Sequence, residues 1–147
     1  MIAEVFVAAY VGHLIGDQWV QTDGQAVAKD QPGWSGRMAC AGHVLGHTIS
    51  TALALNILFL VTGWWPNDWR LAVGLAISAV SHYVIDRRSP LLRVARWVGR
   101  LPYVAAVTVV RSPGGAAQPT GPGTALFHLD QSAHLLFIFV AALVVAA

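Results

Sequence analysis

The sequence predicts an all-α integral membrane protein, a single domain over residues 1–147 organised as a four-helix bundle. Three observations predict this fold class. The chain is 56% hydrophobic and only 11% charged, with a mean hydropathy of +0.58, whereas about a quarter of a soluble domain is charged. Four apolar segments are separated by polar or glycine-rich connections. Two of these segments contain ILFLVTG and LLFIFVAALVVAA, which have no polar face for a soluble bundle to turn toward water.

The four apolar segments are the expected transmembrane helices. They cover residues 2–21, 38–63, 69–86 and 125–146. A bilayer core requires about 20 helical residues, so three segments are long enough and the third is short. Glu4 is the first charged residue and no basic region precedes it, so we expect no cleaved secretory signal.

The three connections between these helices differ in character. Residues 22–37 are polar and of mixed charge, and residues 64–68, WWPND, form an aromatic turn suited to a membrane interface. The connection over residues 87–124 carries six of the nine cationic residues. The positive-inside rule therefore places the 87–124 connection in the cytoplasm, and the 22–37 connection with it.

Within the third connection, the sequence predicts a short interfacial amphipathic helix between helices 3 and 4, over residues 90–100. Its cationic side chains recur at helical spacing: Arg93, Arg96 and Arg100. They would face anionic lipid head groups; the alternative is a solvated helix end that only fixes topology. Residues 112–124 are rich in glycine and proline and predict a flexible loop. YVAAVTVV, residues 103–110, is compatible with a strand or with re-entrant backbone.

Each apolar segment carries one pair of histidine or aspartate side chains four residues apart. The pairs are His13 and Asp17, His43 and His47, His82 and Asp86, and Asp130 and His134. Residues at this spacing share a helix face, with Cβ atoms roughly 5–6 Å apart. Five of the six histidines have such a partner, whereas about one in six would have one by chance. In an up-and-down bundle the pairs lie within roughly 6–14 Å of the cytoplasmic face, the third somewhat shallower.

These eight side chains predict a divalent metal site with one or two ions. A charge in hydrocarbon costs several kcal/mol, so such groups face inward and find partners. Five histidines and three aspartates exceed the needs of one tetrahedral zinc and suit two bridged ions. Zinc is the first choice, and iron or manganese would also suit these ligands. The alternatives are a metal-free hydrogen-bond network between helices, incidental polar residues near the interface, and a bis-histidine haem that would leave the aspartates without a role.

Other polar and small residues lie near the pairs. His128 has no partner at this spacing, and we expect it at a loop edge or beside the ligands. Hydrogen bonds to the ligand side chains are expected from Gln18, Gln21, Thr48, Ser81 and Gln131. Close helix approach, or ordinary membrane-helix packing, is expected at Gly12, Gly16, Gly42 and Gly46.

At HLIGDQWVQTD, GHVLGH, SHYVID and LDQSAH, the sequence resembles a family of small bacterial and phage membrane proteins known as domain of unknown function 3307. The family pattern is HxxGD followed by Q, a histidine-bearing second helix, HxxxD and DQxxH, in that order. The match covers residues 13–134, with a less typical insertion around 100–124. The resemblance implies a membrane-embedded helical bundle in the bacterial inner membrane, or a phage-encoded equivalent. It implies no activity.

The metal site and its depth lead to a functional hypothesis of metal-dependent hydrolysis. The substrate would be a lipid or another membrane-proximal ester or phosphoester. Asp17 is the first choice as general base and Asp130 the second. The alternatives are a divalent-metal transporter and a structural or partner-binding membrane protein in which the metal holds the helices together. The expected partner is the lipid bilayer; no nucleic acid is expected, and the sequence does not predict an oligomeric state.

Overall fold

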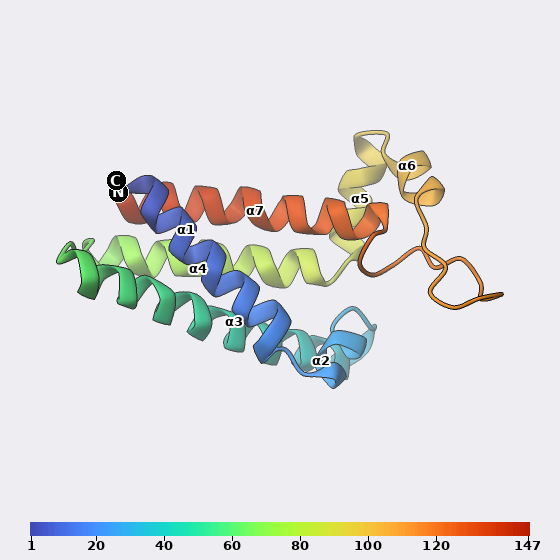
Figure 1. The fold of residues 1–147 in the computed structure, drawn as a ribbon, viewed down its shortest axis with the longest axis horizontal. Coiled ribbons are helices and arrows are strands. Elements are labelled where there is room, and N and C mark those ends of the chain that lie inside the picture. Colours follow the sequence, from blue (N-terminus) through green and yellow to red (C-terminus); the bar gives the residue numbers. More distant parts are fainter.

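Helices account for most of the chain in the computed structural model, which describes residues 1–147 (Figure 1). In chain order they are α1 (Ile2–Ile15), the π-helical turn η1 (Gly16–Val20), α2 (Asp23–Ala28), α3 (Gly33–Thr62), α4 (Asp68–Asp86), α5 (Ser89–Trp97), α6 (Leu101–Ala106) and α7 (Ala125–Ala146). The only β pairing is an isolated antiparallel bridge between Val109 and Gln118. The predicted all-α class is confirmed.

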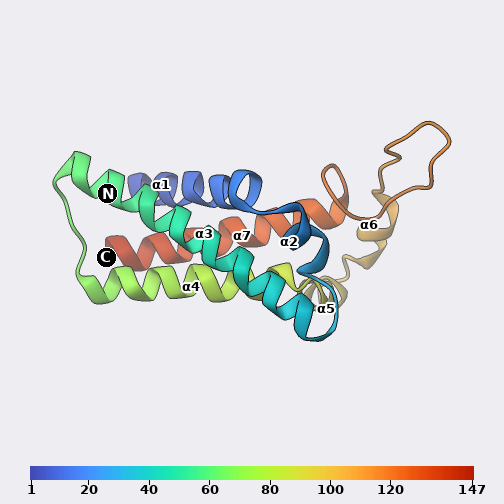
Figure 2. The same cartoon turned by 90° about the horizontal axis from the view of Figure 1, so that it is seen from below.

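The four longest helices, α1, α3, α4 and α7, lie side by side (Figures 1 and 2). α1 packs against α3 and α7, and α4 packs against the same two helices. Both chain termini and the turn between α3 and α4 lie at one end, which we call the terminal end. α2, α5, α6 and the loop before α7 lie at the other, which we call the loop end.

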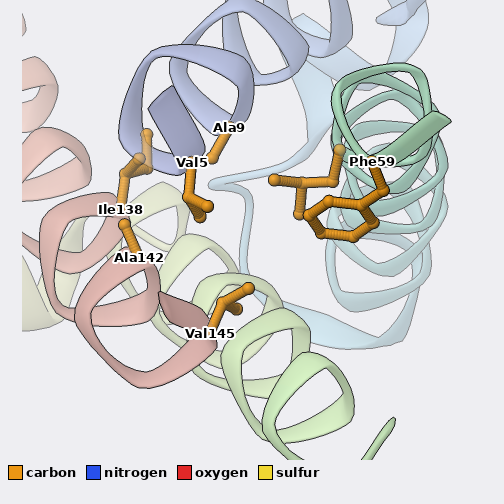
Figure 3. Packing of buried hydrophobic residues seen from close by; sticks show 7 residues of the cluster. Val5, Ala9, Phe59, Ile138, Ala142 and Val145 are labelled. Carbon is orange, nitrogen blue, oxygen red and sulfur yellow. The ribbon is translucent and has the colours of Figure 1, made fainter. Parts of the chain in front are cut away.

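An apolar core fills the terminal half of the bundle (Figure 3). Its seven buried residues come from α1, α3 and α7: Val5, Ala9, Leu55, Phe59, Ile138, Ala142 and Val145. Phe59 is the largest of them and is fully buried. The polar pairs predicted from the sequence lie outside this cluster, toward the loop end of α1, α3, α4 and α7.

The connection over residues 22–37 is more helical than we predicted. Thr22 and Gln25 form a capping box. The Thr22 hydroxyl accepts a hydrogen bond from the Gln25 backbone N–H, and the Gln25 side-chain oxygen accepts one from the Thr22 backbone N–H. This reciprocal capping starts α2. α3 then begins after Pro32, at Gly33 rather than at residue 38. The prediction placed this boundary too late because it followed hydropathy, and a helix can continue beyond its apolar stretch.

The connection over residues 87–124 also differs in detail. α5 ends at Trp97, three residues before the predicted boundary, and Gly99 follows with a φ of 72°. Residues 101–106 form the helix α6, and in the rest of the 103–110 stretch only Val109 makes a β bridge. Residues 112–124 form a loop as predicted. Arg111 stabilises this loop, because its guanidinium donates hydrogen bonds to the backbone carbonyls of Thr120 and Pro122.

Two helices, α3 and α7, are long and apolar enough to cross a membrane. α1 has only 14 residues before the π-helical turn. α4 has 19 residues and carries Asp68, Arg70 and Asp86. The apolar character that indicates a membrane is therefore concentrated in α3 and α7.

Candidate metal centre

Five histidines from four different helices meet inside the loop half of the bundle. Their side chains are at most 2% exposed: His13 on α1, His43 and His47 on α3, His82 on α4 and His134 on α7. Three predicted aspartates join them: Asp17 in η1, Asp86 at the end of α4 and Asp130 on α7. The structure thus brings together all eight residues that the spacing singled out.

The tightest part of the cluster joins α3 and α4 to two carboxylates. His43 Nε2 and His82 Nε2 are 2.9 Å apart. Asp86 Oδ2 lies 3.1 Å from the first nitrogen and 3.2 Å from the second. Asp17 Oδ1 lies 3.4 Å and 3.3 Å from the same two atoms. Around a tetrahedral ion with bonds of about 2.0–2.1 Å, ligand atoms are about 3.3–3.4 Å apart. The four separations between nitrogen and carboxylate oxygen are close to this value, whereas the two nitrogens are at hydrogen-bond distance.

The eight residues divide into three overlapping groups whose ligand atoms lie within 4.8 Å of one another. The groups are His13, Asp17, His47 and His82; His43, His82 and Asp86; and Asp86, Asp130 and His134. His82 belongs to the first two groups, and Asp86 to the last two. Asp17 belongs to the first group and Asp86 to the other two. Groups that overlap in this way could hold adjacent ions that share ligands.

His134 shows how one imidazole is oriented toward the cluster. Its Nδ1 donates to the backbone carbonyl of Asp130 at 3.0 Å and lies 3.4 Å from the Asp130 carboxylate. A carbonyl oxygen only accepts, so Nδ1 carries the proton and Nε2 presents its lone pair. Nε2 is buried, has no hydrogen-bond partner and faces Asp86 at 3.9 Å. Metal-ligating histidines are commonly oriented by such a bond from the other ring nitrogen.

Several buried polar atoms of the cluster lack a hydrogen bond. They are His13 Nε2, Asp17 Oδ1, Asp86 Oδ2 and His134 Nε2, with His43 Nδ1 and His47 Nδ1 nearby on α3. Burying one such atom without a partner costs about 1–3 kcal/mol, and more for a charged group. A divalent cation among them would satisfy the inward-facing lone pairs and offset the carboxylate charge. The donor set therefore fits a metal ion.

Two glycines on the α1 side bring its ligands against α3. A Cβ added at Gly12 would lie 2.5 Å from the Thr51 Cα, and one added at Gly16 would lie 2.7 Å from the His47 Cα. Only glycine permits such an approach of backbone to backbone. Gly16 also begins η1, and π-helical turns occur frequently at functional sites. The close approach predicted at these two glycines is therefore present.

The sequence analysis missed Lys29, which reaches into the cluster from the end of α2. Its Nζ lies 3.0 Å from Asp86 Oδ1, and both side chains are largely buried. The segment that carries it is fastened to the end of α4, because the Arg87 guanidinium donates to the carbonyls of Lys29 and Gln31 at 2.6 and 2.7 Å. No spacing in the sequence connects Lys29 with the paired residues, so the sequence offers no signal for this contact.

A polar pocket of about 530 Å³ opens beside the cluster. Asp17, Asp86 and Asp130 all line it, and so do the cationic residues Lys29 and Arg88. The remaining lining residues come from η1, α7 and the loop before α7: Gln18, Gln21, Thr120, Gly121, Pro122, Leu126, Phe127 and Gln131. The pocket therefore opens onto the carboxylate side of the cluster, where the side chains of Asp17 and Asp130 are 15% and 25% exposed and that of Asp86 is 2% exposed.

Other predicted residues take different places. Thr48 and Ser81 donate to carbonyls of their own helices rather than to ligand side chains. His128 is exposed on the first turn of α7. Three cationic residues of the third connection are exposed and do not line the pocket: Arg93, Arg96 and Arg100.

Sequence comparison places the chain in a family. The family described as a protein of unknown function, DUF3307, matches residues 5–147, which is nearly the whole chain. The chain belongs to the DUF3307 family. No curated protein and no solved structure matched this DUF3307 chain.

Proposed function

We propose that this DUF3307 protein is an integral membrane metal-dependent hydrolase whose four long helices cross the bilayer. The outward faces of these helices support the membrane location. Large apolar side chains such as Leu45, Ile57 and Val80 are exposed. Only 33% of the most apolar stretch of α3 and 28% of that of α7 are buried. An apolar outer face around buried ionisable groups is the pattern of membrane bundles.

The tryptophans support the same location. All six lie near one end of the bundle or the other, and none lies at mid-helix. Trp19, Trp34 and Trp97 are exposed at the loop end, and Trp64, Trp65 and Trp69 lie at the terminal end. Tryptophan is enriched at both membrane–water interfaces. The arginines of the 87–124 connection then orient the loop end, and the pocket, toward the cytoplasm.

We infer that the His/Asp cluster holds one or two divalent ions, with zinc as the first choice. The spacing between the imidazole nitrogens of His43 and His82 and the two carboxylates supports this assignment, because it is near the spacing of ligands around a tetrahedral ion. Imidazole and carboxylate ligands also suit iron and manganese. Such an ion polarises the bond to be broken and lowers the pKa of a bound water toward neutrality.

Hydrolysis, rather than metal binding alone, is supported by one observation: the pocket wall contains carboxylates of the cluster. The contacts also favour a division of roles between two aspartates. Asp17 Oδ1 is held close to two imidazole nitrogens, as a ligand would be. Asp130 is more exposed and contacts only His134 and Gln131. Asp130 is therefore the better placed general base, and Asp17, the first choice from sequence, is the better ligand.

The test compares two isosteric variants of the zinc-loaded protein in detergent. Phosphate-ester and carboxylate-ester p-nitrophenyl substrates report hydrolysis, and zinc content is measured on the same samples. Asp130→Asn should retain zinc and hydrolyse the substrates about 10²–10⁴-fold more slowly than the wild-type protein. Asp17→Asn should lose zinc. An inactive wild-type protein that holds its zinc, or an Asp130→Asn variant with an unchanged rate, would overturn the hydrolase proposal.

The two other functions are less well supported. A transporter needs a polar path to the terminal end, but the apolar cluster around Phe59 fills that half of the bundle. A metal that only holds the helices together needs no substrate-sized space beside it, yet a pocket of about 530 Å³ lies there. Metal flux into proteoliposomes carrying the protein would favour transport.

A further inference from the structure

We propose that the pocket beside the metal centre binds the phosphoryl group of a phosphate monoester, with Lys29 and Arg88 as its cationic contacts. The inference rests on the proposed metal centre and adds the substrate class. Lys29 and Arg88 are the only cationic residues that line the pocket, and Asp17, Asp86 and Asp130 form its metal side.

Lys29 is held where it can contact both a ligand carboxylate and a bound anion. One of its three N–H donors is used by Asp86, which leaves two for an anion. Arg87 fixes the backbone of this segment through the carbonyls of Lys29 and Gln31. The ammonium is therefore positioned by a contact outside the pocket and does not depend on a flexible loop.

Arg88 is held by a second constraint. Its guanidinium pairs with Asp30, next to Lys29 in the chain. Its backbone has a φ of 56°, the only positive φ at a non-glycine residue. Such a conformation is strained and persists only where the surroundings enforce it, often at ligand sites. The Arg88 side chain retains donors beyond the one used by Asp30.

With two divalent ions bound, the charge of the site favours a dianion. The three aspartates and Lys29 carry two net negative charges, because Arg88 is balanced by Asp30. One divalent ion neutralises the site, and a second leaves two positive charges. A phosphate monoester carries up to two negative charges near neutral pH. Two ions held by these ligand groups would also supply the charge stabilisation that phosphoryl transfer needs.

The polarity of the pocket indicates which part of a substrate it takes. Gln18, Gln21 and Gln131 supply amide groups, and the Gln21 Nε2 is buried without a hydrogen-bond partner. Only Leu126 and Phe127 are hydrophobic. The lining thus suits a phosphorylated head group or a small soluble phosphoester, and an acyl chain would lie outside it, against the apolar helix faces.

The test measures inorganic phosphate binding to the zinc-loaded protein in detergent by calorimetry. Lys29→Met should bind phosphate about tenfold more weakly or worse, since a charged hydrogen bond is lost. Lys29→Arg should retain most of the affinity. Arg70→Met removes one cation at the terminal end, beside Trp69, and should leave phosphate binding unchanged. Zinc content, measured in every sample, separates failure of this inference from failure of the metal centre.

A second readout uses the wild-type protein alone. Because Lys29 is the only lysine, acylation of lysine, quantified by mass spectrometry of the peptide that carries it, reports on one site. Phosphate should slow this acylation in the zinc-loaded protein and have no effect after chelation. Absence of phosphate binding at full zinc occupancy, or an unaltered Lys29→Met affinity, overturns the inference. A protein without zinc overturns both proposals.

Competition identifies the source of the phosphoryl group. Glycerol 3-phosphate and short-chain phosphatidic acid in micelles present the same monoester, one in water and one at an interface. Stronger competition by the lipid assigns a membrane substrate. Stronger competition by the soluble ester assigns a cytoplasmic one, and failure of both to compete contradicts a monoester site.

Discussion

Replacing Gly16 by alanine should separate α1 from α3 and weaken metal binding. The added Cβ would lie 2.7 Å from the His47 Cα and 3.1 Å from the His47 Cβ. Carbon atoms pack at about 3.5–4.0 Å, so the two helices must move apart by about 1 Å. Metal–ligand distances tolerate only about 0.2 Å. The site would take ligands from both sides of this contact: His13 and Asp17 on one side, and His43 and His47 on the other. A displacement of this size would therefore break metal–ligand bonds.

Two energetic effects of this substitution oppose each other. Alanine has a higher helix propensity than glycine by about 0.8–1.0 kcal/mol, which would stabilise the variant. Overpacking costs about 1–3 kcal/mol, and the atoms in the way belong to the backbone and a buried imidazole, which cannot rotate aside. We expect overpacking to dominate, with a lower melting temperature and about 10–100-fold weaker zinc binding, the loss typical when the groups that position metal ligands are changed.

The assay is zinc titration and thermal unfolding in detergent for Gly16→Ala and a matched control, Gly24→Ala. A Cβ at Gly24, in α2, meets nothing within 4 Å. The control therefore measures the propensity gain without the steric conflict, and its zinc affinity should equal that of the wild type. Wild-type zinc affinity in Gly16→Ala would refute the claim that close contact between α1 and α3 assembles the site.

Three further variants test separate parts of the account. His82→Ala should lower the zinc content more than His134→Ala does, because His82 belongs to two ligand groups and His134 to one; metal analysis distinguishes them. Phe59→Ala leaves a cavity in the terminal half. In the membrane location proposed above, only packing is lost, so the variant should be destabilised by about 1–3 kcal/mol with zinc content unchanged. Arg87→Gln should speed acylation of Lys29 at constant zinc content, because it removes the contacts that hold that segment.

The sequence could predict which residues form the cluster because helix geometry relates spacing directly to position. Pairs such as His13 and Asp17 must share a face, and a buried charge in an apolar helix must turn inward, so one face per helix converges on a common interior. Helix bounds were predictable wherever hydropathy changed abruptly, as at the start of α7. The start of α3 was less predictable, because its first turns contain Trp34 and Arg37 and lie before the apolar stretch begins.

The pocket could not be predicted because its residues have no shared periodicity. Lys29 lies in a segment whose polarity suggested a loop, and it reaches Asp86 only through the tertiary contacts of Arg87. Thr120 and Pro122 reach the pocket wall through a loop fold held by Arg111. Such contacts depend on how connections fold back over the helices, and spacing along the chain does not determine that.

Elemental analysis of the detergent-purified protein, beside a His43→Ala/His47→Ala double variant, tests the central claim most directly. We expect divalent metal in stoichiometric amount in the wild-type protein, with zinc foremost, and little or none in the double variant at unchanged helical content by circular dichroism. A folded wild-type protein that takes up no divalent metal, or a double variant with the same metal content, would contradict the metal centre and the functions proposed from it.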